Sequence, residues 1–475
     1  MRSLILALAL AAQPAIAQEA PPREKIAIVG ADVLPMTATE RLTDQTVLVD
    51  GERIAAVGPR ASTAVPAGYR TIDARGKVVM PGLVDMHIHM SPAPGTSWDS
   101  TQRALAISLA NGVTTARVMS GAPSHPAVRA SVEAGALAGP RLYIAAPSIA
   151  DPNTPSPDAA RAKVKAAKEA GFDLIKAHSL GEVPTWQAMS SEAANLGIPV
   201  AGHVTNAVGL DRALDARQQI EHLDSIPAAI MPADAPRDFG QFLAKPQLDV
   251  LATVSDSRFA EVAARIRAKG GHVVPTLAAF ERISELERPF ESMLSGPDDD
   301  YVATWVIDDW RARRHGLAEG GFTLEDSRGM TAMRRKIANA LHQAGVPLMA
   351  GSDTPHPFQI WGFGLTREIE ALRQAGLSNI AALRSATVVP RDYLRSLPGQ
   401  GSALAWKAEF GTVEPGARAD LLLLGADPTR DLVALRAIEA VVAGGRVYDS
   451  ARLASMLREA GAAGKAQPAP TPGAP

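Results

Sequence analysis

The chain contains no cysteine in its 475 residues. This absence excludes disulfide bonds, thiolate metal sites, iron–sulfur clusters and a cysteine nucleophile. The chain also has no excess of positive charge, because 48 Lys and Arg stand against 50 Asp and Glu and give a formal net charge of -2. Without a basic field, nucleic acid is not an expected partner. Any metal site must use nitrogen and oxygen ligands, for which ten His are present.

The two ends of the chain differ in composition from the rest. Met1 and Arg2 precede a short apolar run, and Ala15-Ile16-Ala17 supplies a small-x-small cleavage pattern, so residues 1–17 are predicted to be a signal peptide. An uncleaved anchor is the alternative, but the run is shorter than the roughly 20 residues that span a bilayer. We therefore expect a periplasmic or secreted protein without membrane attachment. Residues 460–475 are rich in Ala, Gly and Pro and are predicted to be disordered.

Both ends of the mature chain predict β structure. Residues 24–80 alternate apolar and polar positions around a turn at Asp50-Gly51, and residues 405–450 repeat this style around Gly444-Gly445. Neither segment is long enough to cover both faces of a sheet, so we expect one composite β-sandwich domain built from both ends. Two separate hairpins packed on the main domain are the alternative.

Residues 81–404 alternate helical patterns, glycines and short apolar runs. This order is typical of parallel β/α units and predicts an α/β fold, a (β/α)8 TIM-type barrel. An open doubly wound sheet is the competitor, although no glycine-rich dinucleotide loop follows the first strand. The eight expected strands are Val79–His89, Val113–Met119, Arg141–Ser148, Phe172–Lys176, Ile198–His203, Gln219–Leu223, His272–Leu277 and Val346–Asp353.

Residues 281–328 interrupt this pattern with a helical insertion that carries Trp305 and Trp310. It could form a lid over the barrel or a contact in a homo-oligomer, or it could simply pack on the barrel surface.

Polar residues follow the expected strands at their carboxyl ends, the face on which barrel enzymes build active sites. His87 and His89 are two residues apart and therefore point to the same side of a strand. His203, His222 and Asp353 end three further strands. Four imidazoles and a carboxylate suit a divalent cation, with zinc the first expectation and manganese, cobalt or iron as alternatives.

Lys176 ends the fourth strand among these residues. An ammonium group has no lone pair and would be repelled by a dication. The lysine is therefore either an outer group or one that has been converted into an anion.

The run Pro81-Gly82-Leu83-Val84-Asp85-Met86-His87-Ile88-His89, with Lys176, His203, Ile220-Glu221-His222 and Gly351-Ser352-Asp353, resembles the amidohydrolase superfamily. The chain is most similar to its imidazolonepropionase-like and Xaa-Pro dipeptidase-like branch. The resemblance implies one or two divalent metal ions, one bound by His87, His89 and Asp353 and a second by His203 and His222. It also implies a bridging carbamate on Lys176, made with carbon dioxide, unless the protein is a single-metal member in which Lys176 remains an amine.

The resemblance further implies hydrolysis of an amide, peptide-like or cyclic C–N bond of a small molecule by metal-activated hydroxide, with Asp353 as the catalytic proton shuttle. A Xaa-Pro-type dipeptidase or carboxypeptidase, a non-hydrolytic relative and a non-catalytic metal-binding relative are the alternatives. The stretch His203-Val204-Thr205-Asn206 departs from the His-x-x-Gly pattern of the peptidase members, which weakens the dipeptidase reading.

Three further residues are candidate substrate contacts. His178 lies two positions beyond Lys176, and His356 follows Asp353 into the same region. Arg117 lies inside an apolar strand, where its guanidinium group needs either a substrate carboxylate or an acidic residue of the protein.

Overall fold

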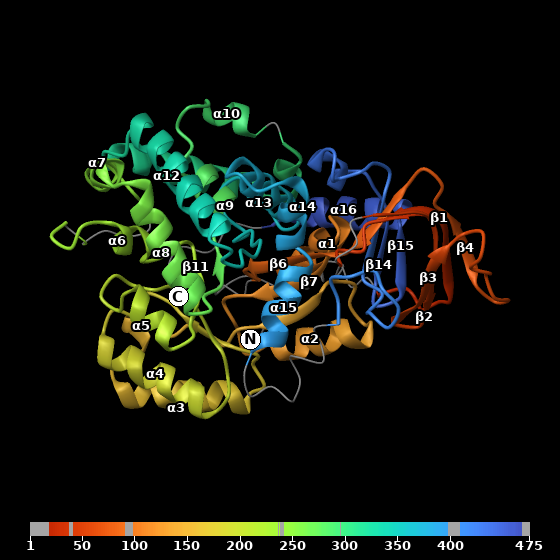
Figure 1. The fold of residues 1–475 in the computed structure, drawn as a ribbon, viewed down its shortest axis with the longest axis horizontal. Coiled ribbons are helices and arrows are strands. Elements are labelled where there is room, and N and C mark those ends of the chain that lie inside the picture. Colours follow the sequence, from red (N-terminus) through yellow and green to blue (C-terminus); the bar gives the residue numbers. More distant parts are fainter. Residues whose placement is uncertain are drawn as a thin grey trace, which may run out of the picture.

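The computed structural model describes residues 19–37, 41–90, 98–235, 237, 242–294, 296–397 and 409–467. The predicted signal peptide, residues 1–17, lies outside these ranges. The molecule combines a mixed β-sheet at one end with a larger helix-rich body that contains parallel strands (Figure 1). Within the described ranges, no helix has both the length and the apolar character needed to cross a bilayer.

The mixed sheet is built from strands at both ends of the chain. Seven of its eight strands run in the order β15-β14-β13-β5-β1-β2-β3, and β4 pairs with the first half of β1 on the edge that β5 also uses, opposite β2. The junction is the antiparallel pairing of β5 with β13, in which Pro81 lies opposite Leu421. Alternate side chains such as Ile26, Ile28 and Val47 fill a core of their own. The strands are β1 Ile26–Val33, β2 Leu42–Asp50, β3 Arg53–Pro59, β4 Arg70–Asp73, β5 Val78–Pro81, β13 Leu421–Leu424, β14 Ile438–Ala443 and β15 Arg446–Asp449.

The larger body contains two parallel sheets, which establishes an α/β fold. One has the order β6-β7-β8 and the other β12-β11-β10-β9. A parallel bridge between Ala145 and Leu174 connects β8 to the start of β9. The strands are β6 Leu83–Ile88, β7 Val113–Val118, β8 Arg141–Ile144, β9 Ile175–Ala177, β10 Val200–Gly202, β11 Gln219–Glu221 and β12 Val273–Val274.

The eighth expected strand, residues 346–353, forms only isolated pairings. Leu348 bridges to Val273 of β12, and Thr354 bridges to Ile88 of β6, both in parallel. Two local features limit the ladder: Pro347 lacks a backbone N–H, and Asp353 adopts a left-handed φ of 55°. The segment therefore lies between β12 and β6 without regular strand geometry.

Helices follow the parallel strands as the sequence pattern predicts. In α3, Ala160, Val164 and Ala167 recur at helical spacing and are buried. Gly171, two residues beyond the end of this helix, adopts a φ of 78° and turns the chain toward β9. The helices are α1 Trp98–Ala110, α2 His125–Ala134, α3 Pro157–Glu169, α4 Val183–Asn195, α5 Leu210–Asp215, α6 Ile226–Ile230, α7 Lys245–Thr253, α8 Asp256–Ala268, α9 Leu277–Ile283, α10 Phe290–Met293, α11 Thr304–Glu319, α12 Leu324–Gln343, α13 Phe363–Gln374, α14 Asn379–Ser385, α15 Val388–Ser396 and α16 Ser450–Lys465.

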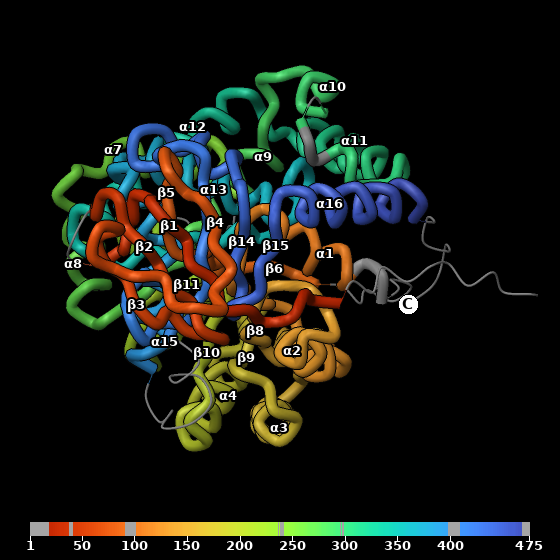
Figure 2. Tube along the Cα trace, turned by 90° about the vertical axis from the view of Figure 1, so that its right-hand side faces the viewer, coloured from red at the N-terminus to blue at the C-terminus, as the bar shows by residue number. Residues whose placement is uncertain are grey.

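Helix α16 corrects the prediction that the chain is disordered from residue 460. The helix continues to Lys465 and packs along α1 (Figure 2). Gly461 and Gly464 let the helix also approach the short 3-10 helix Pro297–Tyr301, because a Cβ atom at Gly464 would lie 2.1 Å from the carbonyl oxygen of Tyr301. The prediction of disorder was based on the scarcity of large apolar residues in this segment. Small residues, however, allow a helix to pack closely against another part of the backbone. Residues 468–475 lie outside the described ranges.

The insertion predicted at 281–328 is helical and includes α10 and α11. Trp305 donates from its indole N–H to the carbonyl of Gln467, just beyond α16. Trp310 is buried, and its ring centroid lies 5.3 Å from that of Phe358. Both tryptophans therefore pack within the chain.

Candidate functional site

The end of β6 brings two imidazoles to one carboxylate. His87 is fully buried, and His89 follows directly after the strand. Nε2 of His87 lies 3.2 Å and Nε2 of His89 lies 2.9 Å from Oδ1 of Asp353. One ligand atom from each of these three residues lies within 4.8 Å of the others, an arrangement that can hold a metal ion.

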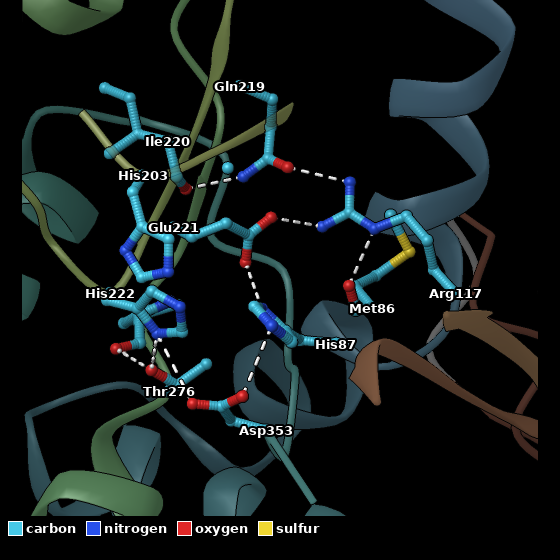
Figure 3. Close-up of polar contacts among 12 residues, drawn as sticks. Met86, His87, Arg117, His203, Gln219, Ile220, Glu221, His222, Thr276 and Asp353 are labelled. Atoms are coloured by element: carbon cyan, nitrogen blue, oxygen red, sulfur yellow. Dashed lines mark hydrogen bonds and ion pairs between the residues drawn. The ribbon is translucent and has the colours of Figure 1, made fainter. Parts of the chain in front are cut away.

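The next imidazoles come from the ends of β10 and β11. The His203 and His222 rings are stacked with centroids 4.6 Å apart, and the His222 centroid is 4.7 Å from that of His87. Nδ1 of His222 lies 3.7 Å from Oδ2 of Asp353. All four predicted histidines therefore surround one region, and Figure 3 shows three of them with Asp353.

Burial keeps the innermost imidazoles neutral. It lowers the pKa of both His87 and His222 well below the ordinary value, although the negative charge of Asp353 opposes the effect. A neutral imidazole has the lone pair that metal coordination requires.

Lys176, in β9, is only 1% exposed. Its Nζ has no hydrogen-bond partner among the described residues, and burial lowers the pKa of the amine. Burial of an amine without hydrogen-bond partners costs free energy. An amine also cannot supply the negative charge that a ligand shared by two metal ions would bring. The donors present fit a divalent cation, and the orphaned amine fits a lysine that can be converted into an anionic ligand.

Three of the histidines that were predicted to bind metal each contact a further side chain through Nδ1. The sequence analysis assigned no role to these three partner residues. Glu221 Oε2 lies 2.6 Å from Nδ1 of His87, Thr276 Oγ1 lies 2.8 Å from Nδ1 of His222, and Asp224 Oδ2 lies 2.8 Å from Nδ1 of His203. Such partners fix the ring orientation and leave Nε2 for another ligand. A sequence signal existed only for Glu221, which directly precedes His222 in the Ile220-Glu221-His222 run.

Arg117, for which a substrate carboxylate and an acidic residue of the protein were the alternatives, has partners within the protein. The guanidinium group is buried and donates to the Met86 carbonyl at 2.7 Å, to Gln219 Oε1 at 2.7 Å and to Glu221 Oε1 (Figure 3). These contacts occupy its donors inside the protein. Arg117 therefore compensates the charge of Glu221, which was the protein-partner alternative for this residue.

His356 and His178, the other two candidate substrate contacts, lie beside the histidines that were predicted to bind metal. Nε2 of His356 is 3.3 Å from Oδ2 of Asp353. Burial alone would raise the pKa of Asp353, but His87, His222 and His356 outweigh it and hold the pKa well below its ordinary value. The ring centroid of His178 is 4.6 Å from that of His203. Asp353 is thus a charged acceptor at neutral pH, with the imidazoles of His87, His89, His222 and His356 around it.

A cavity of about 810 Å³ opens beside this cluster. His178, His203 and His222 line it together with polar residues of the surrounding loops, including Asp151 and Asn206. Its size suits a small organic molecule. The site can therefore combine a metal centre, a charged proton acceptor and a substrate-sized space.

The profile of the Amidohydrolase family matches residues 78–448. Adenine deaminase 2 of Bradyrhizobium sp. (strain ORS 278) is 31% identical over 196 residues, which are 38% of this chain and 32% of that protein. Imidazolonepropionase of Arthrobacter sp. (strain FB24) is 41% identical over 61 residues, which are 13% of this chain and 15% of that protein. The matched parts thus span about a third or less of these relatives' own length.

Among solved structures, a candidate prolidase from Bifidobacterium longum is similar over nearly the whole chain. Its TM-score is 0.64 at 26% sequence identity, and the match covers 92% of this chain and 100% of that one. The similarity therefore includes the two-ended sheet as well as the helix-rich body.

Proposed function

Because this chain belongs to the amidohydrolase family, we propose that it hydrolyses an amide, peptide-like or cyclic carbon–nitrogen bond of a small molecule at the His87–Asp353 cluster. The resemblance inferred from the sequence motifs is confirmed by the family match and by relatives that include an imidazolonepropionase and the prolidase-like structure. The single observation that carries the proposal is the convergence of four imidazoles and Asp353 beside a substrate-sized cavity.

The fold proposed for this body is a (β/α)8 barrel. The two parallel sheets would form two arcs of it, and the segment from Leu348 to Thr354 would take the place of the eighth strand. The parallel bridges at Ala145–Leu174, Val273–Leu348 and Ile88–Thr354 support this interpretation, because they connect the edges in the required order.

We propose that His87, His89 and Asp353 hold one divalent cation and that His203 and His222 hold a second. Lys176 would supply an anionic ligand between them as a carbamate: the unprotonated form of its Nζ would attack carbon dioxide, an N–C bond would form as one C=O π bond gives its electron pair to oxygen, and one proton would be released. The buried, unpartnered Nζ supports this step. When bound, such a metal centre lowers the pKa of water and polarises a carbonyl group. Zinc is the first expectation for histidine and carboxylate ligands.

The protein's own residues would handle the protons. Asp353 is charged at neutral pH and can accept a proton from the attacking water and later deliver it to the leaving nitrogen. His356, at 3.3 Å, holds the second carboxylate oxygen during this transfer. Glu221, Thr276 and Asp224 keep the imidazoles in place, so that the site needs little reorganisation.

The test combines metal analysis with a substrate screen. The purified protein should contain one or two divalent ions per chain and should hydrolyse at least one member of a panel of N-acyl amino acids, dipeptides, lactams and imidazolones. Removal of the ions with a chelator should abolish that activity, and re-addition should restore it. A metal-loaded protein without any C–N hydrolase activity, or full activity without metal, would contradict the proposal.

A Xaa-Pro-type dipeptidase is the second candidate, and the similarity to the prolidase-like structure over the full length of that chain favours it. Hydrolysis of Xaa-Pro dipeptides in preference to every other class in the panel would establish it. Isomerisation or decarboxylation without hydrolysis would point to a non-hydrolytic relative.

We also propose export to the periplasm or beyond, on the basis of the predicted signal peptide at residues 1–17. Amino-terminal sequencing of the protein purified from its native cells should begin at Gln18.

A further inference from the structure

Arg334, in α12, contributes a guanidinium group to the wall of the cavity although only 2% of the residue is exposed. Its Nη2 donates to the carbonyl of His222 at 2.8 Å and to the carbonyl of Pro275 at 3.3 Å. The ring of Phe280 covers one face of the group, with its centroid 3.7 Å from Cζ. Arg334 is therefore fixed in position beside the residue that follows β11.

The three guanidinium nitrogens of Arg334 differ in their surroundings. Nη2 is occupied by the two carbonyl groups, and Nε is buried and has no hydrogen-bond partner among the described residues. Nη1 also donates no hydrogen bond to a described residue, but it is not one of the buried atoms, so it is the nitrogen that keeps accessible surface at the cavity wall. A bound molecule can therefore contact Arg334 through Nη1.

The charge of Arg334 has no acidic partner within the described ranges. A guanidinium group stays protonated in proteins, so its burial leaves a positive charge at the cavity wall. Arg117 is buried to a similar extent, and there Glu221 compensates the charge. Two backbone carbonyls and an aromatic face attract a cation less strongly than a carboxylate does. An anion at Nη1 would supply the compensation that the protein itself does not provide.

We propose that Arg334 binds a carboxylate of the substrate through Nη1, and that this carboxylate is distinct from the carbonyl group that is attacked. The proposal rests on the proposed function of this site and narrows the substrate class to acidic amides, such as N-acyl amino acids. Neutral lactams and amides would lack the contact. Because Arg334 and His222 line the same cavity of about 810 Å³, one small molecule can reach both the histidine cluster and the guanidinium group.

Binding is measured first, with two probes that contain no C–N bond and cannot be hydrolysed. The anion 3-phenylpropanoate and its neutral counterpart 3-phenylpropanol are titrated by calorimetry into the metal-loaded full-length protein. We expect the carboxylate to bind at least about tenfold more tightly. Carboxylates also bind metal ions, so the decisive quantity is the part of this preference that depends on Arg334. Arg334→Gln should reduce the preference by about tenfold.

The matched control is Arg335→Gln, which makes the same change at the next position of α12. Arg335 is ion-paired with Glu281 and does not line the cavity, so this variant should retain the preference. Arg237, the other guanidinium group of the lining, is exposed and offers the competing assignment. Loss of the preference in Arg237→Gln together with its retention in Arg334→Gln would overturn the proposal.

Arg334 also supports the carbonyl of His222, so binding must be separated from support. Elemental analysis measures the bound metal of each variant, and Arg334→Lys keeps a positive charge at the cavity wall. The lysine variant should retain more of the preference than the glutamine variant. An equal loss of affinity for both probes in the two variants would overturn the proposal, because it would assign Arg334 a purely structural role.

Catalysis supplies the second measurement. For an N-acyl amino acid and its primary amide, Arg334→Gln should raise KM for the acid about tenfold relative to KM for the amide. Equal binding of the two probes by the wild-type protein would overturn the proposal even if the enzyme hydrolyses C–N bonds. A preference that depends on Arg334, in a protein that hydrolyses no compound of the panel, would retain the proposal while refuting the proposed function.

Discussion

Glu221 joins His87 to Arg117 in the centre of the protein. One carboxylate oxygen lies 2.6 Å from the imidazole Nδ1, and the other accepts a hydrogen bond from the guanidinium Nη2 (Figure 3). All three side chains are buried. Burial raises the pKa of Glu221, and the positive charge of Arg117 opposes that rise. The candidate metal ligand His87 is therefore oriented by the carboxylate of Glu221, and the charge of Glu221 depends on Arg117.

Replacement of Arg117 should destabilise the protein strongly. Arg117→Met leaves Glu221 buried without its cation, and the breaking of a buried pair costs about 3–5 kcal/mol. Urea denaturation should show this loss in the free energy of unfolding. The matched control is Arg161→Met, which breaks an exposed pair with Asp158 and should change stability by about 0–1 kcal/mol. Equal effects of the two variants would contradict the assigned role.

Lys176→Ala tests the bridging carbamate. The variant should lose one bound metal per chain, as measured by elemental analysis, because no anion remains between the two sets of imidazoles. Short carboxylic acids such as acetate should restore part of the metal and of the activity. The control Lys168→Ala removes an exposed lysine of α3 and should keep the wild-type metal content. Full occupancy of two ions in Lys176→Ala without added acid would refute the bridge.

Asp353→Asn separates metal binding from proton transfer. The amide retains an oxygen ligand but cannot accept the proton, so kcat should fall by about 10²–10⁴-fold while most of the bound metal remains. Elemental analysis and steady-state kinetics on the same preparation measure both effects. Asp158→Asn, with the same chemical change at the surface, should behave as the wild type. Undiminished turnover in Asp353→Asn would remove this residue from the mechanism.

Glu368 gives a pH-dependent contribution to stability. It is fully buried, and burial raises its pKa to about 8 from an ordinary value of 4.5. Because the folded-state pKa is raised, the stabilisation by the neutral form is fully present below about pH 4.5 and is lost as the pH rises to about 8. Between pH 5 and pH 8, the wild type should lose on the order of a few kcal/mol more than Glu368→Gln.

Denaturation curves of both proteins at the two pH values measure this difference. The glutamine can still accept the hydrogen bond that the Ala278 N–H donates to Oε2 at 2.8 Å, so the variant should fold. The same pH dependence in both proteins would show that Glu368 does not titrate in this range.

The strand order and the four histidines could be predicted because each depends on local pattern. His87 and His89 end an apolar run, and the ends of parallel strands share one face. Thr276 could not be assigned, because its contact with His222 joins positions 54 residues apart and no chain pattern links them. Arg117 could be recognised as buried, but the choice between a substrate and Glu221 as its partner required the fold.

The mixed sheet also constrains how the protein is made. Strand β5 has β13 as its neighbour, and β13 begins only at Leu421, so a ribosome must translate most of the message before that edge can be covered. Until then, an apolar strand edge remains open to association with other chains. A chain that ends upstream of Leu421 should therefore leave this edge uncovered and should aggregate.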